Sequence, residues 1–267
     1  MENLNLKMRD AKELAGTPTW FRAIEVGSIL TFWSLVGAVI WKVSPHFHDS
    51  PWLILSGFLT GFIMADWVSG LVHWLADTWG SVDMPVIGKS LLRPFREHHV
   101  DQKAMTHHDY IETNGSNCMI SVPWAIGAFL IPINPGPYHW VSLFNVVWIT
   151  SMIFWVMMTN QFHKWAHMDD GRAPKIVTAL QKMHLILPPA HHHLHHTAPF
   201  DKYYCITTGW LNWPLTKLGF FKGMERLVTA LTGVIPRKDD IGIEAAIAIA
   251  PGVDDGAPVV QAKSKEA

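Results

Sequence analysis

Long apolar runs alternate with polar segments along this chain, and the lengths of the runs predict membrane-spanning helices. The runs cover residues 24–43, 51–75, 118–133 and 140–159. About 20 predominantly apolar residues are needed to cross the hydrocarbon core of a bilayer as a helix. The third run is shorter than the others and contains Pro123 and Pro132. We therefore predict an all-α integral membrane protein with about four transmembrane helices.

Basic residues are distributed unevenly around these runs, and this asymmetry predicts an orientation. The links 44–50 and 134–139 contain no Lys or Arg, whereas segment 1–23, the loop after the second run and the chain beyond Lys164 are basic. Short loops rich in Lys and Arg stay in the cytoplasm. We therefore expect both termini and the loop after the second run on the cytoplasmic side of a bacterial inner membrane or, in a eukaryote, of the endoplasmic reticulum.

The chain after the fourth run has a different pattern. Residues 172–233 mix apolar and basic positions without a spanning run, which predicts a cap of amphipathic helices on the membrane surface. Residues 239–267 are rich in Ala, Gly, Pro and Asp, and we expect a disordered tail there. The predicted organisation is a cytoplasmic segment 1–23, a membrane domain 24–238 and the tail. A soluble protein with buried helices is the weaker alternative, because all the runs share one charge asymmetry.

Composition narrows the possible functions. The chain has 267 residues, of which 49% are apolar and 12% aromatic, and this excludes a disordered chain. With 21 basic and 22 acidic residues there is no basic excess to displace counterions from a nucleic acid. Cys118 and Cys205 lie far apart, so a cysteine-ligated metal site is also excluded. Any metal must be held by nitrogen and oxygen ligands.

Histidines supply such ligands, because most of the 16 fall beside the predicted cytoplasmic ends of the helices. Residues three or four apart share one face of a helix. His163 and His167 have this spacing, and so do three histidines in the segment AHHHLHH. The candidate ligands are His73, His98, His99, His163, His167, His192, His195 and His196. Asp77, one turn after His73, could bind a metal directly or orient an imidazole.

Eight imidazoles are too many for one ion, and two metals with about four nitrogen ligands each fit the number. A hydrolytic zinc site needs only three protein ligands and a water. Two irons suit oxygen chemistry beside a bilayer, which predicts an oxygen-dependent desaturase or hydroxylase. A histidine-rich metal transporter is a lesser alternative, because it should place its ligands along a path through the membrane. A purely structural membrane protein is a further alternative, and substitution of its histidines by alanine would leave it unaffected.

Several long strings extend beyond the histidines themselves. They are DWVSGLVHWLADTWGS, FREHHVDQ, HHDYIETNGSN, TNQFHKWAH and HHHLHHTAPFDKYYCITTGWLNWPLTKLGF. On these strings the chain resembles the plasmanylethanolamine desaturases of the Kua/CarF-like lipid desaturase family over about residues 63–233. The resemblance implies that two hydrogens are removed beside the ether oxygen of a 1-O-alkyl glycerophosphoethanolamine, giving the vinyl ether of a plasmalogen. It also implies two iron ions, O₂ as co-substrate and an electron donor such as cytochrome b5 or a ferredoxin-like protein.

The resemblance also assigns roles to residues. The family's eight-histidine set falls on the eight candidate ligands above, and Asp101, His108 and His191 match as residues that support the ligands or add to them. His107 and His193 depart from the family pattern. Residues that could meet the phosphoethanolamine headgroup are Arg93, Arg96, Asn114 and Asn117. The alternative activities are desaturation of an acyl chain, as in the plant branch of the family, and hydroxylation. Asp66, a carboxylate inside the second run, is expected to anchor the site or a partner helix.

Overall fold

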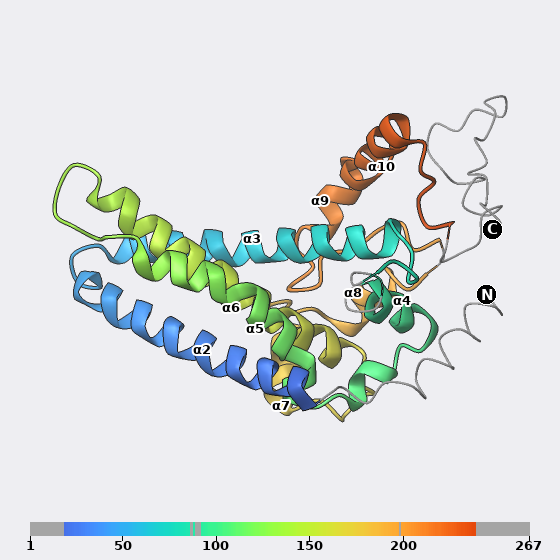
Figure 1. The fold of residues 1–267 in the computed structure, drawn as a ribbon, viewed down its shortest axis with the longest axis horizontal. Coiled ribbons are helices and arrows are strands. Elements are labelled where there is room, and N and C mark those ends of the chain that lie inside the picture. Colours follow the sequence, from blue (N-terminus) through green and yellow to red (C-terminus); the bar gives the residue numbers. More distant parts are fainter. Residues whose placement is uncertain (1–18, 86–87, 89–91, 198, 239–267) are drawn as a thin grey trace.

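A bundle of long helices dominates the molecule. The computed structural model describes residues 19–85, 88, 92–197 and 199–238, and every regular element within them is a helix. The bundle consists of α2 (Thr19–Val43), α3 (Pro51–Thr78), α5 (Tyr110–Leu130) and α6 (His139–Ala166). Helix α6 packs against both α3 and α5, and α2 packs mainly against α5 (Figure 1). The prediction of an all-α protein is confirmed.

Three of the long helices match the predicted membrane spans. Helices α2, α3 and α6 are long and apolar enough to cross a bilayer, and α5 does not meet the same criterion. The first half of α5 contains the polar string ETNGSN, and Pro123 lies inside the helix. The presence of a helix at the third run is therefore confirmed, while its crossing of the membrane stays a prediction. The predicted tail 239–267 lies outside the described residues, as does most of segment 1–23.

Helices α3 and α6 approach each other closely because small residues line their contact. A Cβ atom added to Gly61 would lie 2.5 Å from the Trp148 carbonyl oxygen, and one added to Gly57 would lie 3.1 Å from Val147. The Ser151 hydroxyl donates a 2.7 Å hydrogen bond to the Phe58 carbonyl. Small residues four apart allow helix backbones to pack closely in a membrane, where the hydrophobic effect adds little between helices. This contact sets the relative position of the two helices that carry ligand candidates at their ends.

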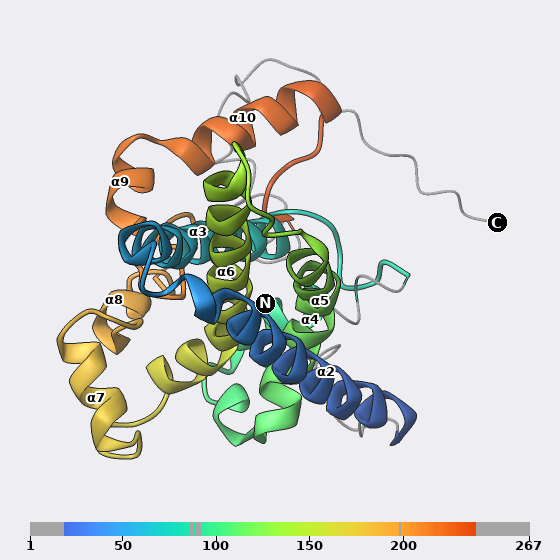
Figure 2. The same cartoon turned by 90° about the vertical axis from the view of Figure 1, so that its left-hand side faces the viewer.

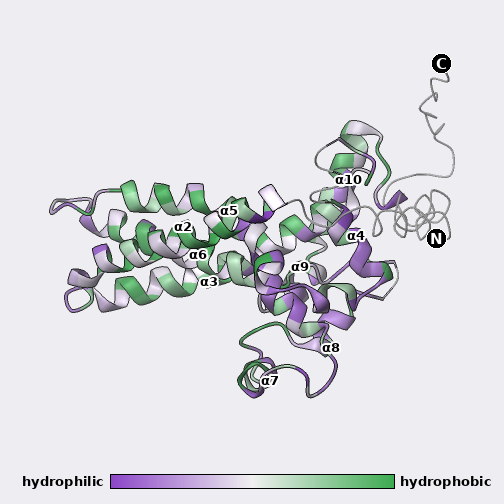
Figure 3. Ribbon diagram, turned by 60° about the horizontal axis from the view of Figure 1, so that its bottom comes forward, coloured by the Kyte–Doolittle hydropathy of each residue, from purple (hydrophilic) through white to green (hydrophobic). Residues whose placement is uncertain are grey.

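The two ends of the bundle differ in character. At one end, which we call the histidine end, α3 and α6 finish beside the short helices α4 (Arg93–Val100) and α8 (Pro189–His193). Helices α7 (Lys175–Lys182), α9 (Asn212–Lys217) and α10 (Phe220–Thr232) project sideways from this end (Figure 2). Hydrophobic residues dominate the long helices, and hydrophilic residues gather at the histidine end (Figure 3). The predicted cap of helices is present.

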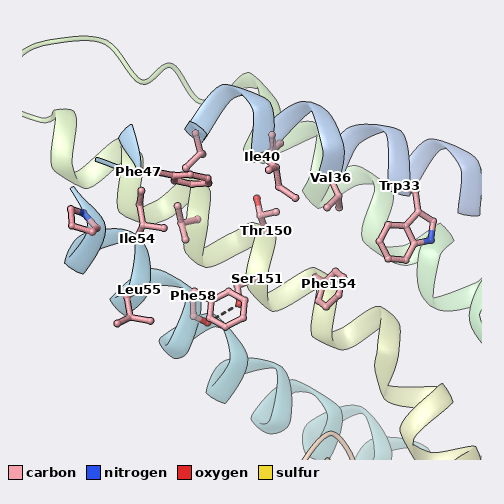
Figure 4. A pocket seen from close by; sticks show the side chains of 14 residues that line it. Trp33, Val36, Ile40, Phe47, Ile54, Leu55, Phe58, Thr150, Ser151 and Phe154 are labelled. Atoms are coloured by element: carbon pink, nitrogen blue, oxygen red, sulfur yellow. Dashed lines mark hydrogen bonds between the residues drawn. The ribbon is translucent and has the colours of Figure 1, made fainter. Parts of the chain in front are cut away.

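An apolar pocket of about 540 Å³ lies toward the opposite end of the bundle, between α2, α3 and α6 (Figure 4). Its walls include Trp33, Val36, Phe58 and Phe154, and it extends to Phe47 beside the connection between α2 and α3. None of the candidate metal ligands lines this pocket. Its residues belong to the apolar part of the bundle and take no part in the histidine site.

Candidate metal centre

The eight candidate histidines come together at the histidine end, although they come from four separate parts of the chain. His73 lies in the last turns of α3, His98 and His99 in α4, and His163 in α6. His167 caps the C-terminus of α6, and His192 lies in α8 with the other two just beyond it. Seven of these residues are buried, and the side chain of His99 is only 2% exposed. Burial of so many imidazoles requires that their nitrogens have partners.

Their nitrogens form two groups, and within each group one nitrogen from every residue lies within 4.8 Å of the others. The first group consists of His98, His163, His167, His192 and His196. The second consists of His73, His98, His99 and His195, so His98 belongs to both. Each of the two groups therefore offers enough nitrogen ligands for a metal ion.

Distances within the first group have the pattern of a ligand set. The Nε2 atoms of His163, His167 and His192 lie 2.8, 3.0 and 3.1 Å from one another. A neutral imidazole nitrogen is either a donor or an acceptor, so three nitrogens in mutual contact cannot all be joined by hydrogen bonds. Ligands at about 2.1 Å from one metal and at right angles to each other lie about 3.0 Å apart. The residues present thus fit a metal ion.

Backbone carbonyls orient the imidazoles of the second group. His73 Nδ1 lies 3.0 Å from the Tyr204 carbonyl oxygen, and His195 Nδ1 lies 2.9 Å from that of Lys202. A carbonyl oxygen can only accept, so each Nδ1 carries the proton and each Nε2 presents a lone pair. The Nε2 atom of His73 has no hydrogen-bond partner and is fully buried. Such an atom is available to a metal.

Asp77 lies among the nitrogens of the second group. Its Oδ2 atom is 3.0 Å from His73 Nε2, 3.3 Å from His195 Nε2 and 3.6 Å from His99 Nε2. The carboxylate is fully buried, and neither oxygen has a partner that meets hydrogen-bond geometry. An uncompensated buried charge is strongly destabilising. A cation at this position would compensate the carboxylate, so the placement favours direct ligation over a purely orienting role.

Burial favours the neutral form of several of these histidines. It lowers the pKa of His98 and His192 well below the usual range, and the neighbouring imidazoles lower it further. The same causes lower the pKa of His167 to about 3 and that of His195 to about 4. Only the neutral form of an imidazole binds a metal. These four imidazoles are thus ready to bind a cation at physiological pH without first losing protons.

Asp66 holds the loop that completes this site. Its Oδ1 atom accepts hydrogen bonds from the amides of Thr208 and Gly209, at 2.8 and 2.9 Å, and its Oδ2 atom accepts one of 3.1 Å from Leu211. The Ser69 hydroxyl, one turn later on α3, accepts a 3.1 Å bond from the Ile206 amide. Next along this face is His73, whose Nδ1 meets the Tyr204 carbonyl. The carboxylate expected to be an anchor thus attaches the loop 204–211 to α3.

Three of the four residues expected to meet a headgroup have other partners. Arg96 is 1% exposed, and its guanidinium donates to the carbonyls of Ala76 and Trp79 at the C-terminus of α3. Asn114 is fully buried between α5 and α6, where it donates to Gln161, and Asn117 donates to the Val156 carbonyl. These three residues therefore stabilise helix ends and contacts. Arg93 is half-buried at the start of α4.

The additional residues named with the ligands lie outside both groups. Asp101 is exposed, and its carboxylate accepts from the Lys103 amide. His108 faces Glu112, with 3.6 Å between Nε2 and Oε1. His191 Nε2 lies 3.1 Å from the Asn212 side-chain amide, so it orders the loop. His193 and His107, which depart from the family pattern, are exposed.

Sequence reasoning did not identify a buried ion pair beside this site. Arg237 donates to both carboxylate oxygens of Glu225, at 2.8 and 2.6 Å, and also to the Tyr204 hydroxyl. Trp74 donates to the same carboxylate at 3.1 Å. This contact attaches α10 to the end of α3. No local spacing signals it, because the partners meet only in the tertiary structure.

Comparison of the sequence with known proteins shows which family the chain is similar to. Residues 62–239 match the model of the lipid desaturase domain. The chain is 54% identical to the plasmanylethanolamine desaturase of Myxococcus xanthus, over 96% of this chain and 90% of that protein. It is 46% identical to plasmanylethanolamine desaturase 1 of Mus musculus, over 71% of this chain and 70% of the mouse protein.

A chloroplast protein of Arabidopsis thaliana, fatty acid desaturase 4-like 1, is 29% identical over 82% of this chain and 70% of the plant protein. No solved structure matches the chain.

Proposed function

This chain belongs to the lipid desaturase family, and we propose that it converts a 1-O-alkyl glycerophosphoethanolamine into the vinyl-ether lipid, a plasmalogen. The similarity to proteins of that name in a bacterium and a mammal supports the substrate class. The two buried groups of imidazole nitrogens support an oxidative reaction and carry the proposal. In the balanced reaction the two alkyl carbons beside the ether oxygen lose two hydrogens. O₂ takes up these, two electrons from a donor and two protons, and leaves as two waters.

Each part of the site has a defined task in this reaction. The first group would hold one iron, and the second group with Asp77 would hold the other. When bound, the irons supply the redox chemistry that O₂ activation requires. Burial favours the neutral form of His167, His192 and His195. Backbone carbonyls fix the rings of His73 and His195.

We further propose that the histidine end faces the cytoplasm. The uneven distribution of Lys and Arg supports this orientation. Helices α7 and α10 carry the exposed apolar side chains of Ile176, Leu227 and Leu231 beside the polar cap, and the exposed Met183 caps α7. These helices are suited to lie in the interface between headgroups and hydrocarbon. A cytoplasmic site would be open to a soluble or membrane-bound donor such as cytochrome b5 or a ferredoxin-like protein.

The plant relative gives a specific reason to keep acyl-chain desaturation as the second candidate, because its name specifies a fatty acid desaturase. Lipid mass spectrometry distinguishes the two. The chain would be expressed in cells that lack plasmalogens and are fed a 1-O-alkylglycerol. We expect acid-labile vinyl-ether phosphatidylethanolamine to form. New acyl unsaturation without a vinyl ether would favour the second candidate.

Two histidine variants serve as a matched pair in the same experiment. His195→Ala removes a buried ring of the second group, whereas His193→Ala removes an exposed ring two residues away. We expect His195→Ala to abolish the product and to lower the iron content of purified protein, with normal membrane insertion. His193→Ala should keep most of the activity. Equal effects of the two variants would contradict the assignment of the ligands.

A further inference from the structure

A second pocket, of about 450 Å³, opens beside the first group of imidazoles. Its walls include His167, His192 and His196, which are three members of that group. Lys103, Asp169 and Asp170 line the same pocket. Its volume lies within the range of about 300–1,000 Å³ that is typical of small-molecule sites. The pocket thus joins a candidate metal group to a small set of charged side chains.

The chemistry of the proposed reaction explains why charges are needed at this position. The carbons that lose hydrogen lie next to the ether oxygen, and only the glycerol backbone separates them from the phosphate. A substrate whose reacting carbons lie at the metals must therefore place its headgroup close by. The headgroup has one negative phosphate and one positive ammonium, so a matching pocket needs both signs of charge within a short distance.

We propose that this pocket binds the zwitterionic phosphoethanolamine headgroup, with the phosphate at Lys103 and the ammonium at Asp170. This inference rests on the proposed function, because it assigns the headgroup position of the same substrate. It replaces the predicted contacts to Arg96 and Asn114, which are buried against other partners.

Lys103 is fixed in place and retains one donor. Its Nζ donates to the carbonyl oxygen of His167 at 2.9 Å and to Asp169 Oδ1 at 2.5 Å. An ammonium group has three N–H donors, so one is left for a phosphate oxygen. The bond to His167 also holds this charge at the backbone of a candidate ligand.

The acidic side of the pocket has an unused carboxylate. Asp169 forms an ion pair with Lys103, and its Oδ2 atom lies 3.6 Å from Arg172 Nη1. Asp170 is exposed at the pocket and forms no ion pair within the described part of the chain. A primary ammonium can donate three hydrogen bonds to such a carboxylate. A choline group cannot donate any, and it favours a cage of aromatic rings.

No Trp, Tyr or Phe side chain lines this pocket in the described part of the chain. The lining therefore favours ethanolamine over choline. The two charged residues should affect recognition differently, because both headgroups carry the phosphate and only one carries a hydrogen-bonding ammonium.

The test compares 1-O-alkyl phosphatidylethanolamine with 1-O-alkyl phosphatidylcholine as substrates of purified, iron-loaded protein. Asp170→Asn should lower the preference for ethanolamine about tenfold, mainly through KM, because one charge-assisted contact is lost. Lys103→Met should raise KM for both lipids by a similar factor, and Lys103→Arg should restore much of it. Asp49→Asn and Lys175→Met, which change exposed residues outside the pocket, are the matched controls.

Binding to metal-free protein gives a second readout. Short-chain 1-O-alkyl phosphoethanolamine should bind more tightly than its phosphocholine counterpart, and Asp170→Asn should remove the difference. Unchanged KM values and unchanged headgroup preference in both variants would overturn the proposal. Iron content, measured in parallel, shows whether Lys103→Met disturbs the metals, in which case Asp170→Asn decides. If the parent forms no vinyl ether, the proposed function fails, and the binding experiment still decides the headgroup assignment.

Discussion

Substitution of Asp66 by asparagine tests whether one carboxylate positions the loop that completes the metal centre. The side chain keeps its shape but loses its charge and one acceptor. The asparagine oxygen can still accept from Thr208 and Gly209, which now bond to Oδ1. The new amide group then faces the Leu211 amide, which now donates to Oδ2. Two donors oppose each other there, so that hydrogen bond is lost.

The expected destabilisation follows from these contacts. The lost bond to the charged group contributes about 1.5–3 kcal/mol. The two remaining bonds become neutral and about half as strong, a loss of about 1 kcal/mol each. Removal of a buried charge from the protein interior offsets part of this cost. We expect a net loss of about 3 kcal/mol in the free energy of unfolding, a large share of the 5–15 kcal/mol typical of a domain.

Ser69→Ala is the comparison variant, because it removes a single hydrogen bond, from the Ile206 amide of the same loop. We expect it to cost about 1 kcal/mol. Denaturant titration in detergent, followed by tryptophan fluorescence, measures both losses. Iron content should fall in Asp66→Asn, since the displaced loop no longer orients His73 through the Tyr204 carbonyl. If Asp66→Asn were no more destabilised than Ser69→Ala, the anchoring role would be refuted.

Two further predictions concern the ion pair and the effect of pH. Arg237→Met leaves the Glu225 carboxylate buried and unpaired, so we expect a loss of about 3–5 kcal/mol in unfolding free energy. The double variant with Glu225→Gln should recover part of it, and a further loss in that variant would argue against the pair. The pKa of His167 is lowered to about 3 and that of His195 to about 4, so the unfolded chain binds more protons below pH 6.5. The melting temperature of metal-free protein should therefore fall between pH 6.5 and 4, less steeply in His195→Gln, and a flat profile would contradict this.

Hydropathy predicted the apolar parts of the long helices but not their full lengths. The fourth run ended at residue 159, but α6 continues to Ala166, and its final turns carry His163. The third run began at residue 118, but α5 begins at Tyr110 with a polar string that donates to α6. Apolar runs indicate which part of a helix contacts lipid or core. Polar turns that face a buried site belong to the same helix, but no apolar run marks them in the sequence.

The candidate ligands could be named from sequence because their spacing is local. A spacing of four residues predicts that His163 and His167 lie on one side, and the same holds for His192 and His196. Their Nε2 atoms lie 3.1 and 2.9 Å apart, although His167 only caps α6 and His196 lies just beyond α8. The placement of Arg96 could not be predicted in this way. The role of Arg96 depends on its contact with the end of α3, which forms only in the tertiary structure. In the sequence, a basic residue near a membrane looks the same whether it contacts a phosphate or a carbonyl.

The attachment of the loop 204–211 to α3 also bears on the order in which the protein is made. Chains emerge from the ribosome N-terminus first. Helices α3 and α6 are therefore synthesised well before the segment with His192, His195 and His196, and before the loop that Asp66 holds. The earlier part of the chain has the three helices that are long and apolar enough to cross a membrane, but only five of the eight candidate ligands. The set of candidate ligands is thus completed only late in synthesis, and a nascent or truncated chain would have the apolar helices without the full set.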